Sequence, residues 1–496
     1  PTGSGLGGGG FWLLHRADGF ETLVDGREVA PLSATRDMYL DARGVADPKR
    51  STDGALAAAI PGEPAALAHL AQKYGTLPLA ELLAPAQRFA HDGFAVDRKL
   101  ADAIARNAAR FSGEAAEVFA PGGSPLQAGD LLRQPQLADT LTQLGADADA
   151  FYRGAWGQRW TTAVRAAGGI WSDADLRGYR VVERTPAVTW FRDWKITSAP
   201  PPSAGGIALT QVLQMLESLG APLDAGPRTE HLVIEALRRA YADRQRHLGD
   251  PGFVTVPHRL SAREYNLALV RGIDPAHATP SDKLNGGGEG GNTTHFSVLD
   301  AAGNRVAGTL SINLPFGSAA MVGGTGVLLN DEMDDFAASV TASNAYGLAG
   351  SQANMIAAGK RPLSSMSPTF VEGPNGLLIT GTPGGSRIVS MVLLAIASFV
   401  QDLDVAQIAA LGRYHHQYLP DVVEFEPGAL PPEHQAALQA AGHVLRATGA
   451  PYGNLNSVLW NPRRDVLAAS ADPRGVGTSA VKRIVKASAD ETRERP

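Results

Sequence analysis

The stretch from Gly286 to Asp300, "GGGEGGNTTHFSVLD", places a glycine tract directly before a segment with the pattern of a strand. Glycine tracts act as linkers or let the backbone approach a neighbouring group closely. Residues 271–292 have no periodicity, whereas polar and apolar residues alternate after Thr293, as they do in strands. A strand needs no flexible segment before it. We therefore interpret the tract as the slack for a cut of the chain between Asn292 and Thr293.

The next strand-like segment brings a second hydroxyl close to Thr293. "TTHFSVLD" and "RVAGTLSINL" are separated by "AAGN", and this spacing predicts a tight hairpin. Two registers fit the spacing, one with Thr293 opposite Ser311 and one with Thr293 opposite Ile312. In the first register the side chains of Thr293 and Ser311 share a face of the sheet, with Cβ atoms about 5 Å apart.

A threonine hydroxyl is a weak nucleophile unless a base activates it. The α-amine of Thr293 becomes that base if the chain is cut before this residue, because an α-amino group has a pKa of about 7.7–8.0, close to the working pH of most enzymes. The local pattern alone also permits a β-hairpin that simply follows a surface linker.

Composition limits the class of protein. The chain has 496 residues, of which 44% are hydrophobic and 19% charged, as in soluble globular proteins, and this length allows about three domains. The net charge of −6 provides no basic field for nucleic acid or an anionic membrane. The absence of cysteine excludes disulfides, a cysteine nucleophile and cysteine-ligated zinc. The longest apolar run, Ile388–Val400, is shorter than the roughly 20 residues of a transmembrane helix, and no signal peptide is visible.

Several other segments have clear patterns. "GFWLLHRADGFETLVDG" predicts a hairpin that turns at residues 17–19, and residues 62–145 have helical periodicity. "RTPAVTWFRDWKITSAPPP" predicts strands that end in a proline run. "TEHLVIEALRRAYADRQRHLG" predicts a helix capped by Gly249, and a further helix is expected from Ser386 to Val400.

Motifs along nearly the whole chain resemble those of the γ-glutamyltranspeptidases in order and spacing. They are "GLGGGGF", "REVAP", "YADR", "NTTHFSVLDAAGNRVAGTLSINLPFG", "GVLLNDEMDDF", "KRPLSSMSPTFV", "GTPGGSRI" and "RYHHQYLPD". The resemblance implies an N-terminal nucleophile hydrolase of the α+β class, a four-layer αββα sandwich with two mainly antiparallel sheets between helices. It also implies self-cleavage into a large-subunit portion, residues 1–292, and a small-subunit portion, residues 293–496, which together form one αββα unit.

The resemblance assigns the catalytic roles to four residues. Thr293 matches the threonine that provides both the nucleophilic hydroxyl and the basic amine. Ser311 matches a position that is usually threonine, and it keeps the hydroxyl that hydrogen-bonds around the nucleophile. Gly384 and Gly385 match the oxyanion hole. Two backbone N–H groups just before a helix are well suited to stabilise a developing oxyanion.

The resemblance also implies a subsite for the α-amino-acid end of the substrate, which needs a cation for its carboxylate and an anion for its ammonium group. Arg27 matches the carboxylate-binding arginine, and Asp335 and Glu332 match the acidic pair that holds the ammonium group. Without the resemblance these residues would be interpreted as loop charges. The other matches are Ser364 and Ser365 as hydroxyl partners of the carboxylate, Asn313 beside the α-amine, and Tyr346 in a lid loop over the bound glutamyl group.

Two further motifs do not predict sites. His415 and His416 are adjacent, so they do not share one helix face, and a structural role is expected for both. "GLGGGGF" leads into a strand and not into a helix, unlike a dinucleotide-binding fingerprint. The resemblance implies no cofactor and no metal.

The implied activity is that of a γ-glutamyltranspeptidase or glutathione hydrolase, in which Thr293 takes the γ-glutamyl group from glutathione or a related donor and passes it to water, an amino acid or a peptide. One alternative is a glutaryl-cephalosporin-type acylase of the same family, whose substrate lacks the α-amine; Asp335 and the lid argue against it. The other is an uncleaved, non-catalytic homologue; Thr293 and the two glycines argue against that. The resemblance further implies a periplasmic or secreted location and a segment before "GLGGGGF", with a helix and a strand of the central sheet, that the chain as given does not contain.

Overall fold

Five strands form the first sheet of the protein, in the order β5-β2-β1-β9-β8, and every neighbouring pair in it is antiparallel. The computed structural model describes residues 2–281, 293–339, 343–345, 347–348 and 350–482. Along β1 the side chains alternate: Phe11 and Leu13 belong to the main hydrophobic core, whereas Trp12 packs beneath helix α2. The strands are β1 (Gly9–His15), β2 (Glu21–Gly26), β5 (Val182–Arg184), β8 (Thr293–Leu299) and β9 (Arg305–Ser311).

The second sheet has six antiparallel strands in the order β18-β17-β13-β12-β7-β6. It stacks on the first sheet, and the core between them contains Phe11 and Leu13 from β1 together with Phe370 and Ile379 from the second sheet. Its strands are β6 (Ala187–Phe191), β7 (Trp194–Ser198), β12 (Thr369–Gly373), β13 (Gly376–Gly381), β17 (Asn456–Asn461) and β18 (Val466–Ser470).

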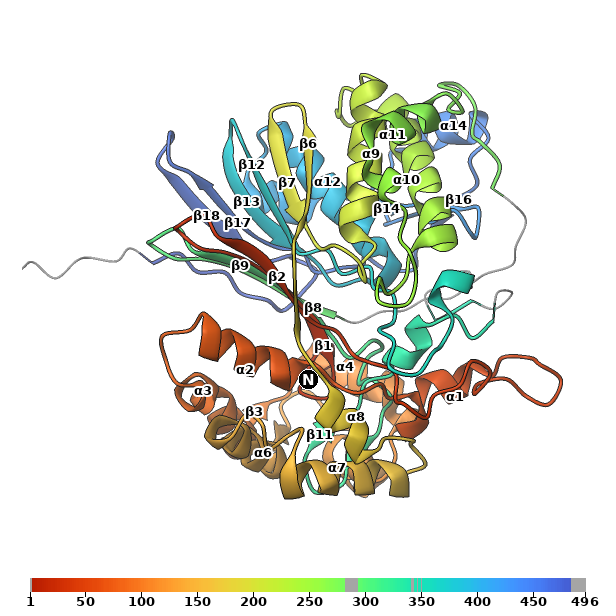
Figure 1. Ribbon diagram of the computed structural model, residues 1–496. Coiled ribbons are helices and arrows are strands. Elements are labelled where there is room, and N and C mark those ends of the chain that lie inside the picture. The colour runs from red at the N-terminus through yellow and green to blue at the C-terminus, as the bar shows by residue number, and fades with distance from the viewer. Residues whose placement is uncertain (1, 282–292, 340–342, 346, 349, 483–496) are drawn as a thin grey trace, which may run out of the picture.

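Helices cover the outer face of each sheet (Figure 1). On the second sheet lie α9 (Gly205–Ser218), α10 (Pro227–His247), α11 (Arg263–Val270) and α12 (Ile388–Val400). On the side of the first sheet lie α2 (Glu63–Lys73), α3 (Leu79–Asp92), α6 (Pro135–Ala146) and α7 (Gly154–Ala166). This arrangement confirms the predicted αββα sandwich. No helix in the described ranges is both long and apolar enough to span a membrane.

Shorter elements complete the chain. The helices are α1 (Pro48–Thr52), α4 (Arg98–Asn107), α5 (Glu114–Phe119), α8 (Asp173–Gly178), α13 (Val405–Ala410) and α14 (Pro432–Ala440). The strands are β3 (Phe94–Ala95), β4 (Leu131–Leu132), β10 (Met321–Val322), β11 (Val327–Leu328), β14 (Tyr414–His415), β15 (Val423–Phe425) and β16 (Leu445–Ala447).

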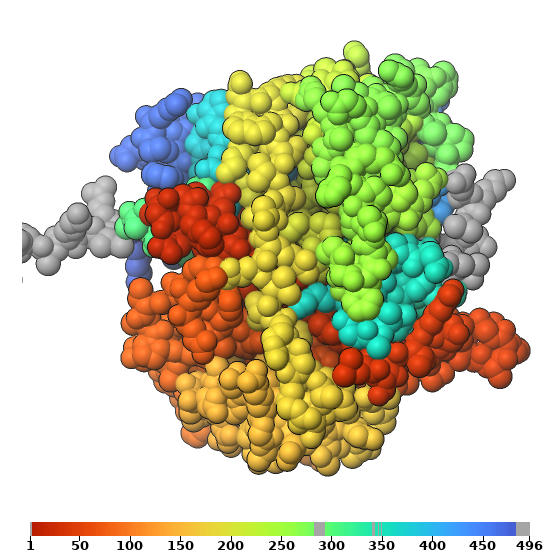
Figure 2. All heavy atoms as spheres, in the orientation of Figure 1, coloured from red at the N-terminus to blue at the C-terminus, as the bar shows by residue number. Residues whose placement is uncertain are grey.

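The residues before and after Thr293 contribute strands to both sheets. β1, β2 and β5 pair with β8 and β9 in the first sheet, and β6 and β7 join strands from the later part of the chain in the second. Figure 2 shows the yellow segment after α8 as it crosses the front of the molecule toward β6. This segment connects the side of the first sheet to the second sheet. A cut before Thr293 therefore leaves two pieces that share both sheets.

Local expectations are met in part. The β1–β2 hairpin forms, and the β8–β9 hairpin takes the register in which Thr293 pairs with Ser311. The prediction that Gly249 caps the helix was wrong: the C-cap of α10, Leu248, is already extended, and Gly249 after it lacks the positive φ of a left-handed glycine cap. Gly249 is instead packed against backbone: a Cβ at this position would lie 2.4 Å from the carbonyl oxygen of Ala353. The helix predicted from Ser386 to Val400, α12, begins two residues later than expected, after a single 3-10 turn.

Candidate active site

Thr293 is the first residue of β8, and its hydroxyl lies next to that of Ser311 on β9. The two Oγ atoms are 3.3 Å apart, and both side chains are buried. The alternation along β8 turns Thr293 and His295 inward and leaves Thr294 exposed. Burial of His295 lowers its pKa to about 3, so this imidazole is neutral at physiological pH.

The backbone around Ser311 is held closely on two sides. The N–H of Asn313 donates to Ser311 Oγ at 2.8 Å, and Asn313 adopts a positive φ of 72°, which asparagine tolerates better than most residues. On the other side Gly8 lies against the chain, where a Cβ would come within 2.0 Å of the Ser311 carbonyl oxygen. The glycines of "GLGGGGF" therefore allow close packing next to the reactive pair.

One pocket brings together most of the predicted site. Tyr346 and Asn292 lie outside the described residues, although Leu348, two positions after Tyr346, lines this pocket. Gly384 lines a neighbouring pocket, and Ser386 is common to the two. The predicted residues in the first pocket are Thr293, Ser311, Gly385, Arg27, Asn313, Glu332, Asp335, Ser364 and Ser365.

Arg27 is the buried cation of this pocket, and three carboxylates surround it. Its Nη1 donates to Glu332 at 2.6 Å and to Glu28 at 3.1 Å, its Nη2 pairs with Asp335, and its Nε donates to the carbonyl of Pro362 at 3.3 Å. Burial alone would lower the pKa of Arg27, but the ion pairs with Glu332, Glu28 and Asp335 raise it above its ordinary value. Burial raises the pKa of Glu332 well above normal and that of Glu28 to about 7.

Ser364 and Ser365 lie on the wall that faces this charge cluster. The carbonyl of Ser364 accepts from the N–H of Ala204 at 2.8 Å, and its hydroxyl oxygen accepts from the N–H of Met366 at 3.0 Å. The Oγ of Ser365 accepts from Nη2 of Arg244 at 3.3 Å. Both hydroxyls are thus held in place by the protein at the edge of the pocket.

The Gly384–Gly385 turn has a backbone conformation that favours glycine. Both residues have positive φ, 140° and 56°, which glycine adopts without strain. The turn leads into a 3-10 turn and then α12, so the positive end of a helical segment faces the site. Tyr241 of α10 donates to the carbonyl of Ser386, and Met391 packs so closely that a Cβ on Gly384 would lie 2.5 Å from its Cε.

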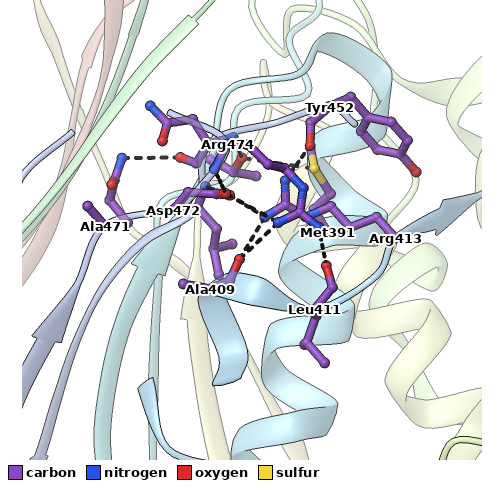
Figure 3. A network of polar contacts seen from close by, with 12 residues as sticks. Met391, Ala409, Leu411, Arg413, Tyr452, Ala471, Asp472 and Arg474 are labelled. Atoms are coloured by element: carbon purple, nitrogen blue, oxygen red, sulfur yellow. Dashed lines mark hydrogen bonds and ion pairs between the residues drawn. The ribbon is translucent and has the colours of Figure 1, made fainter. Parts of the chain in front are cut away.

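A largely buried polar network lies beside Met391, the residue that packs against Gly384 (Figure 3). Arg413 pairs with the carboxylate of Asp472 and donates to the carbonyl of Tyr452, and Arg474 reaches Asp472 at 3.2 Å. Arg413 and Asp472 are both 2% exposed, and Met391 lies beside the network. Gly453, next to Tyr452, lies close to both Arg413 and Met391 of α12, so the network and the helix pack against the same segment.

The adjacent histidines face different partners. His415 Nδ1 is 2.9 Å from Ser390 Oγ, and His416 Nε2 is 3.1 Å from Asp421. Burial lowers the pKa of both, that of His415 to about 4. In the described ranges no group of three or more His, Asp or Glu side chains is arranged to hold a metal ion.

Two charged residues of the site were missed by sequence reasoning. Arg244 lines the pocket from α10, and Glu28 pairs with Arg27 beneath it. Both belong to motifs that carry the family resemblance, "YADR" and "REVAP". Charged residues on the apolar face of a helix or strand are rarely buried without a role; Arg244 lies on the buried face of α10, and this position was the available signal.

Two antiparallel sheets between helical layers, with a threonine hydroxyl at the start of the edge strand β8 and a glycine turn at the same pocket, define an N-terminal nucleophile hydrolase. The family model for gamma-glutamyltranspeptidase matches residues 1–482, and the chain belongs to this family of enzymes.

The relatives agree with this assignment. The chain is 39% identical to a glutathione hydrolase proenzyme of Escherichia coli over 489 residues, which cover 96% of this chain and 84% of that protein. It is 37% identical to a glutathione hydrolase proenzyme of Pseudomonas aeruginosa, with coverage of 97% and 87%.

Solved structures share the fold. A cephalosporin acylase from Bacillus halodurans superimposes with a TM-score of 0.84 at 25% identity and covers 98% of this chain and 89% of that one. A chain of the Helicobacter pylori gamma-glutamyltranspeptidase is 38% identical with a TM-score of 0.54, and the match covers 55% of this chain and 81% of that one. That partial coverage is consistent with a family member whose two subunits are separate chains.

Proposed function

We propose that this protein cuts itself between Asn292 and Thr293 and then transfers the γ-glutamyl group of glutathione or a related donor to water, an amino acid or a short peptide. The observation that carries the proposal is the pocket that joins the Thr293–Ser311 hydroxyl pair to the buried Arg27 and the half-buried Asp335. A nucleophile beside both a cation and a carboxylate suits a donor whose far end is an α-amino acid.

After the cut, the neutral α-amine of Thr293 takes the proton from its own hydroxyl as Oγ1 attacks the γ-carbonyl carbon of the donor. The backbone N–H groups of Gly384 and Gly385 stabilise the tetrahedral oxyanion. The amine then returns the proton to the leaving nitrogen, the C–N bond breaks, and a γ-glutamyl ester on Thr293 remains. Water or an acceptor amine attacks this ester with the same base and regenerates the free hydroxyl.

Recognition of the donor replaces ion pairs within the protein with ion pairs to the donor. In this structure Arg27 pairs directly with Asp335 and Glu332. The α-carboxylate of the donor binds toward Arg27, Ser364 and Ser365, and its ammonium group binds toward the two acidic residues. Because each buried charge keeps an opposite partner, the exchange avoids the large cost of an unpaired buried ion.

The large and small portions stay together after the cut, because each contributes strands to both sheets. Separation would expose the core between the sheets, which contains residues from both sides of Thr293. We therefore infer that the active form is a stable pair of chains that share one active site.

The glutaryl-acylase alternative has one observation in its favour, the structural similarity to a cephalosporin acylase. A glutaryl group has no amine, so it would leave the buried carboxylate of Glu332 and the half-buried carboxylate of Asp335 without a cation from the substrate. Removing one partner of a buried pair costs about 2–5 kcal/mol. The charge pattern of the pocket therefore favours the γ-glutamyl donor.

The test uses the purified protein. A denaturing gel with N-terminal sequencing is expected to show two chains, the smaller of which begins at Thr293. Glutathione is expected to release glutamate, and γ-glutamyl anilide is expected to react far faster than glutaryl anilide. A single uncut chain that folds correctly, or equal rates for the two anilides, would count against the proposal.

A further inference from the structure

Arg244 is a second buried guanidinium in the donor pocket. It lies on α10, is 7% exposed, and faces the pocket that contains Thr293 and Ser365. Among the described residues no carboxylate lies within ion-pair distance of Arg244, its Nε has no hydrogen-bond partner, and its Nη2 donates to Ser365 Oγ at 3.3 Å. Burial lowers the pKa of Arg244, and the more distant Tyr241 and Asp335 offset this only in part, whereas the carboxylates in direct contact with Arg27 raise its pKa.

An unpaired buried charge is costly, and a protein that retains one commonly uses it to bind an ion of opposite charge. The pocket leaves Arg244 turned toward the space that a donor would fill. Arg244 also lines a second cavity, together with Asp334, Asp335 and Leu348. Arg244 therefore borders both cavities.

Arg27 alone does not offer enough donors for the carboxylate of a substrate. A guanidinium has five N–H donors, and four contacts of Arg27 are already made to Glu28, Glu332, Asp335 and the carbonyl of Pro362. A carboxylate bound in the usual forked manner takes two donors. A second hydrogen-bond donor group is therefore needed to bind the carboxylate, unless the substrate displaces one of the carboxylates that Arg27 contacts.

Ser365 connects Arg244 to the same carboxylate. Because its Oγ accepts a hydrogen bond from Arg244, its hydroxyl hydrogen is directed toward another acceptor. Arg244 therefore orients this hydroxyl and at the same time presents its own unpaired Nε–H.

We propose that Arg244 is a specificity residue that selects donors with an α-carboxylate, by binding that carboxylate together with Ser365. This inference rests on the proposed γ-glutamyl transfer. The carboxylate of the substrate then supplies the opposite charge that no described residue places within ion-pair distance of this buried guanidinium.

Three anilide donors separate this role from a purely structural one. The γ-glutamyl donor has both the carboxylate and the amine, the glutaryl donor has only the carboxylate, and the 4-aminobutanoyl donor has only the amine. With Arg244→Met we expect kcat/KM to fall at least about 30-fold for the first two donors, mainly through KM, and to change less than about threefold for the third. Inhibition constants of glutarate and 4-aminobutanoate provide the same comparison without turnover.

Two variants control the experiment. Arg246→Met, on the exposed side of the same helix, should change none of the three rates. Arg244→Lys keeps the charge without the planar fork, so it should show the same order of donors with a smaller loss, and it replaces the methionine variant if that protein does not fold.

The outcomes are distinct. Equal losses for all three donors, or no loss for any, would overturn the inference while the proposed function stands. A wild-type protein that does not react with γ-glutamyl anilide would instead remove the proposed function itself.

Discussion

Thr293 Oγ1 lies 3.3 Å from Ser311 Oγ across the first residue pair of the β8–β9 ladder. Both residues are on strands of an inner sheet, so their separation is set by backbone pairing and not by a loop. A nucleophile on such a frame keeps its geometry when the segment before it is cut. The same hydroxyl is therefore available first for self-cleavage and then for turnover.

The variant Thr293→Ala should block both cleavage and turnover, because one hydroxyl performs both reactions. Thr294→Ala is the matched control: its side chain is exposed, and its hydroxyl contacts Ser4 at 3.1 Å on the other face. Gels and anilide assays of the two proteins make the comparison. Wild-type turnover by Thr293→Ala would end the assignment of the nucleophile.

Ser311→Ala should slow cleavage and turnover by roughly 10- to 1000-fold, the scale of losses when a group that positions the reactants is removed. Ser311→Thr keeps the hydroxyl and should stay close to wild type. Single-turnover rates and the time course of chain cleavage measure the two effects. Full activity in the alanine variant would show that the 3.3 Å contact is not used.

Much of this geometry could be predicted from sequence because it is local. The spacing of the hairpin leaves only Ser311 or Ile312 as the residue opposite Thr293, and the backbone pairing of β8 with β9 selects Ser311. The glycine turn before α12 follows from residue type, since two adjacent glycines favour a turn. The family resemblance then supplied the sandwich and the αββα order of layers, which local patterns alone do not determine.

The charge cluster could not be predicted in the same way. Arg27 and Glu332 are 305 positions apart, and their contact depends on how the strands and the loop after β11 pack. The family resemblance assigned them to opposite ends of a substrate, whereas in the unliganded protein they pair with each other. Tyr346 and Asn292 lie outside the described residues, so their roles remain predictions, as does a periplasmic or secreted location.

Arg27→Ala and Asp335→Ala should each lower kcat/KM for the γ-glutamyl donor strongly, since loss of one partner of a buried pair costs about 2–5 kcal/mol. Self-cleavage should persist, because the scissile bond needs no donor carboxylate. Arg16→Ala, which removes an exposed ion pair with Asp18, is the control. Normal kcat/KM in both pocket variants would show that the subsite has been placed wrongly.

Glu63 provides a test of stability against pH. Its carboxylate is buried at the start of α2, Oε2 has no partner among the described residues, and burial raises the pKa to about 8 from an ordinary value of 4.5. Between these values the folded state holds more protons than the unfolded state, so stability falls as pH rises through this window, by at most about 5 kcal/mol.

The variant Glu63→Gln has an amide at this position, which does not ionise in this pH range. It should therefore gain stability relative to the parent as pH rises from about 5 to about 8.5. Urea unfolding in the Thr293→Ala background keeps a single chain and avoids dissociation. If the difference in urea midpoint between Glu63→Gln and its parent is the same at about pH 5 and at about pH 8.5, Glu63 is not protonated in the folded protein.

The pH dependence of turnover separates the two enzyme classes. The α-amine of Thr293 must be neutral to accept the hydroxyl proton, so kcat/KM should fall on the acid side, near an ordinary amine pKa of about 7.7–8.0 or somewhat below it. If Asp335 and Glu332 hold the ammonium group of the donor, kcat/KM should also fall on the alkaline side as that group loses its proton. A γ-glutamyl donor then gives a bell-shaped profile. A glutaryl donor with the same leaving group should keep the acid limb and lose the part of the alkaline limb that depends on the donor amine. It should also react far more slowly, because it leaves the carboxylates of the pocket without a cation from the substrate. Comparable rates and identical profiles for the two donors would favour an acylase.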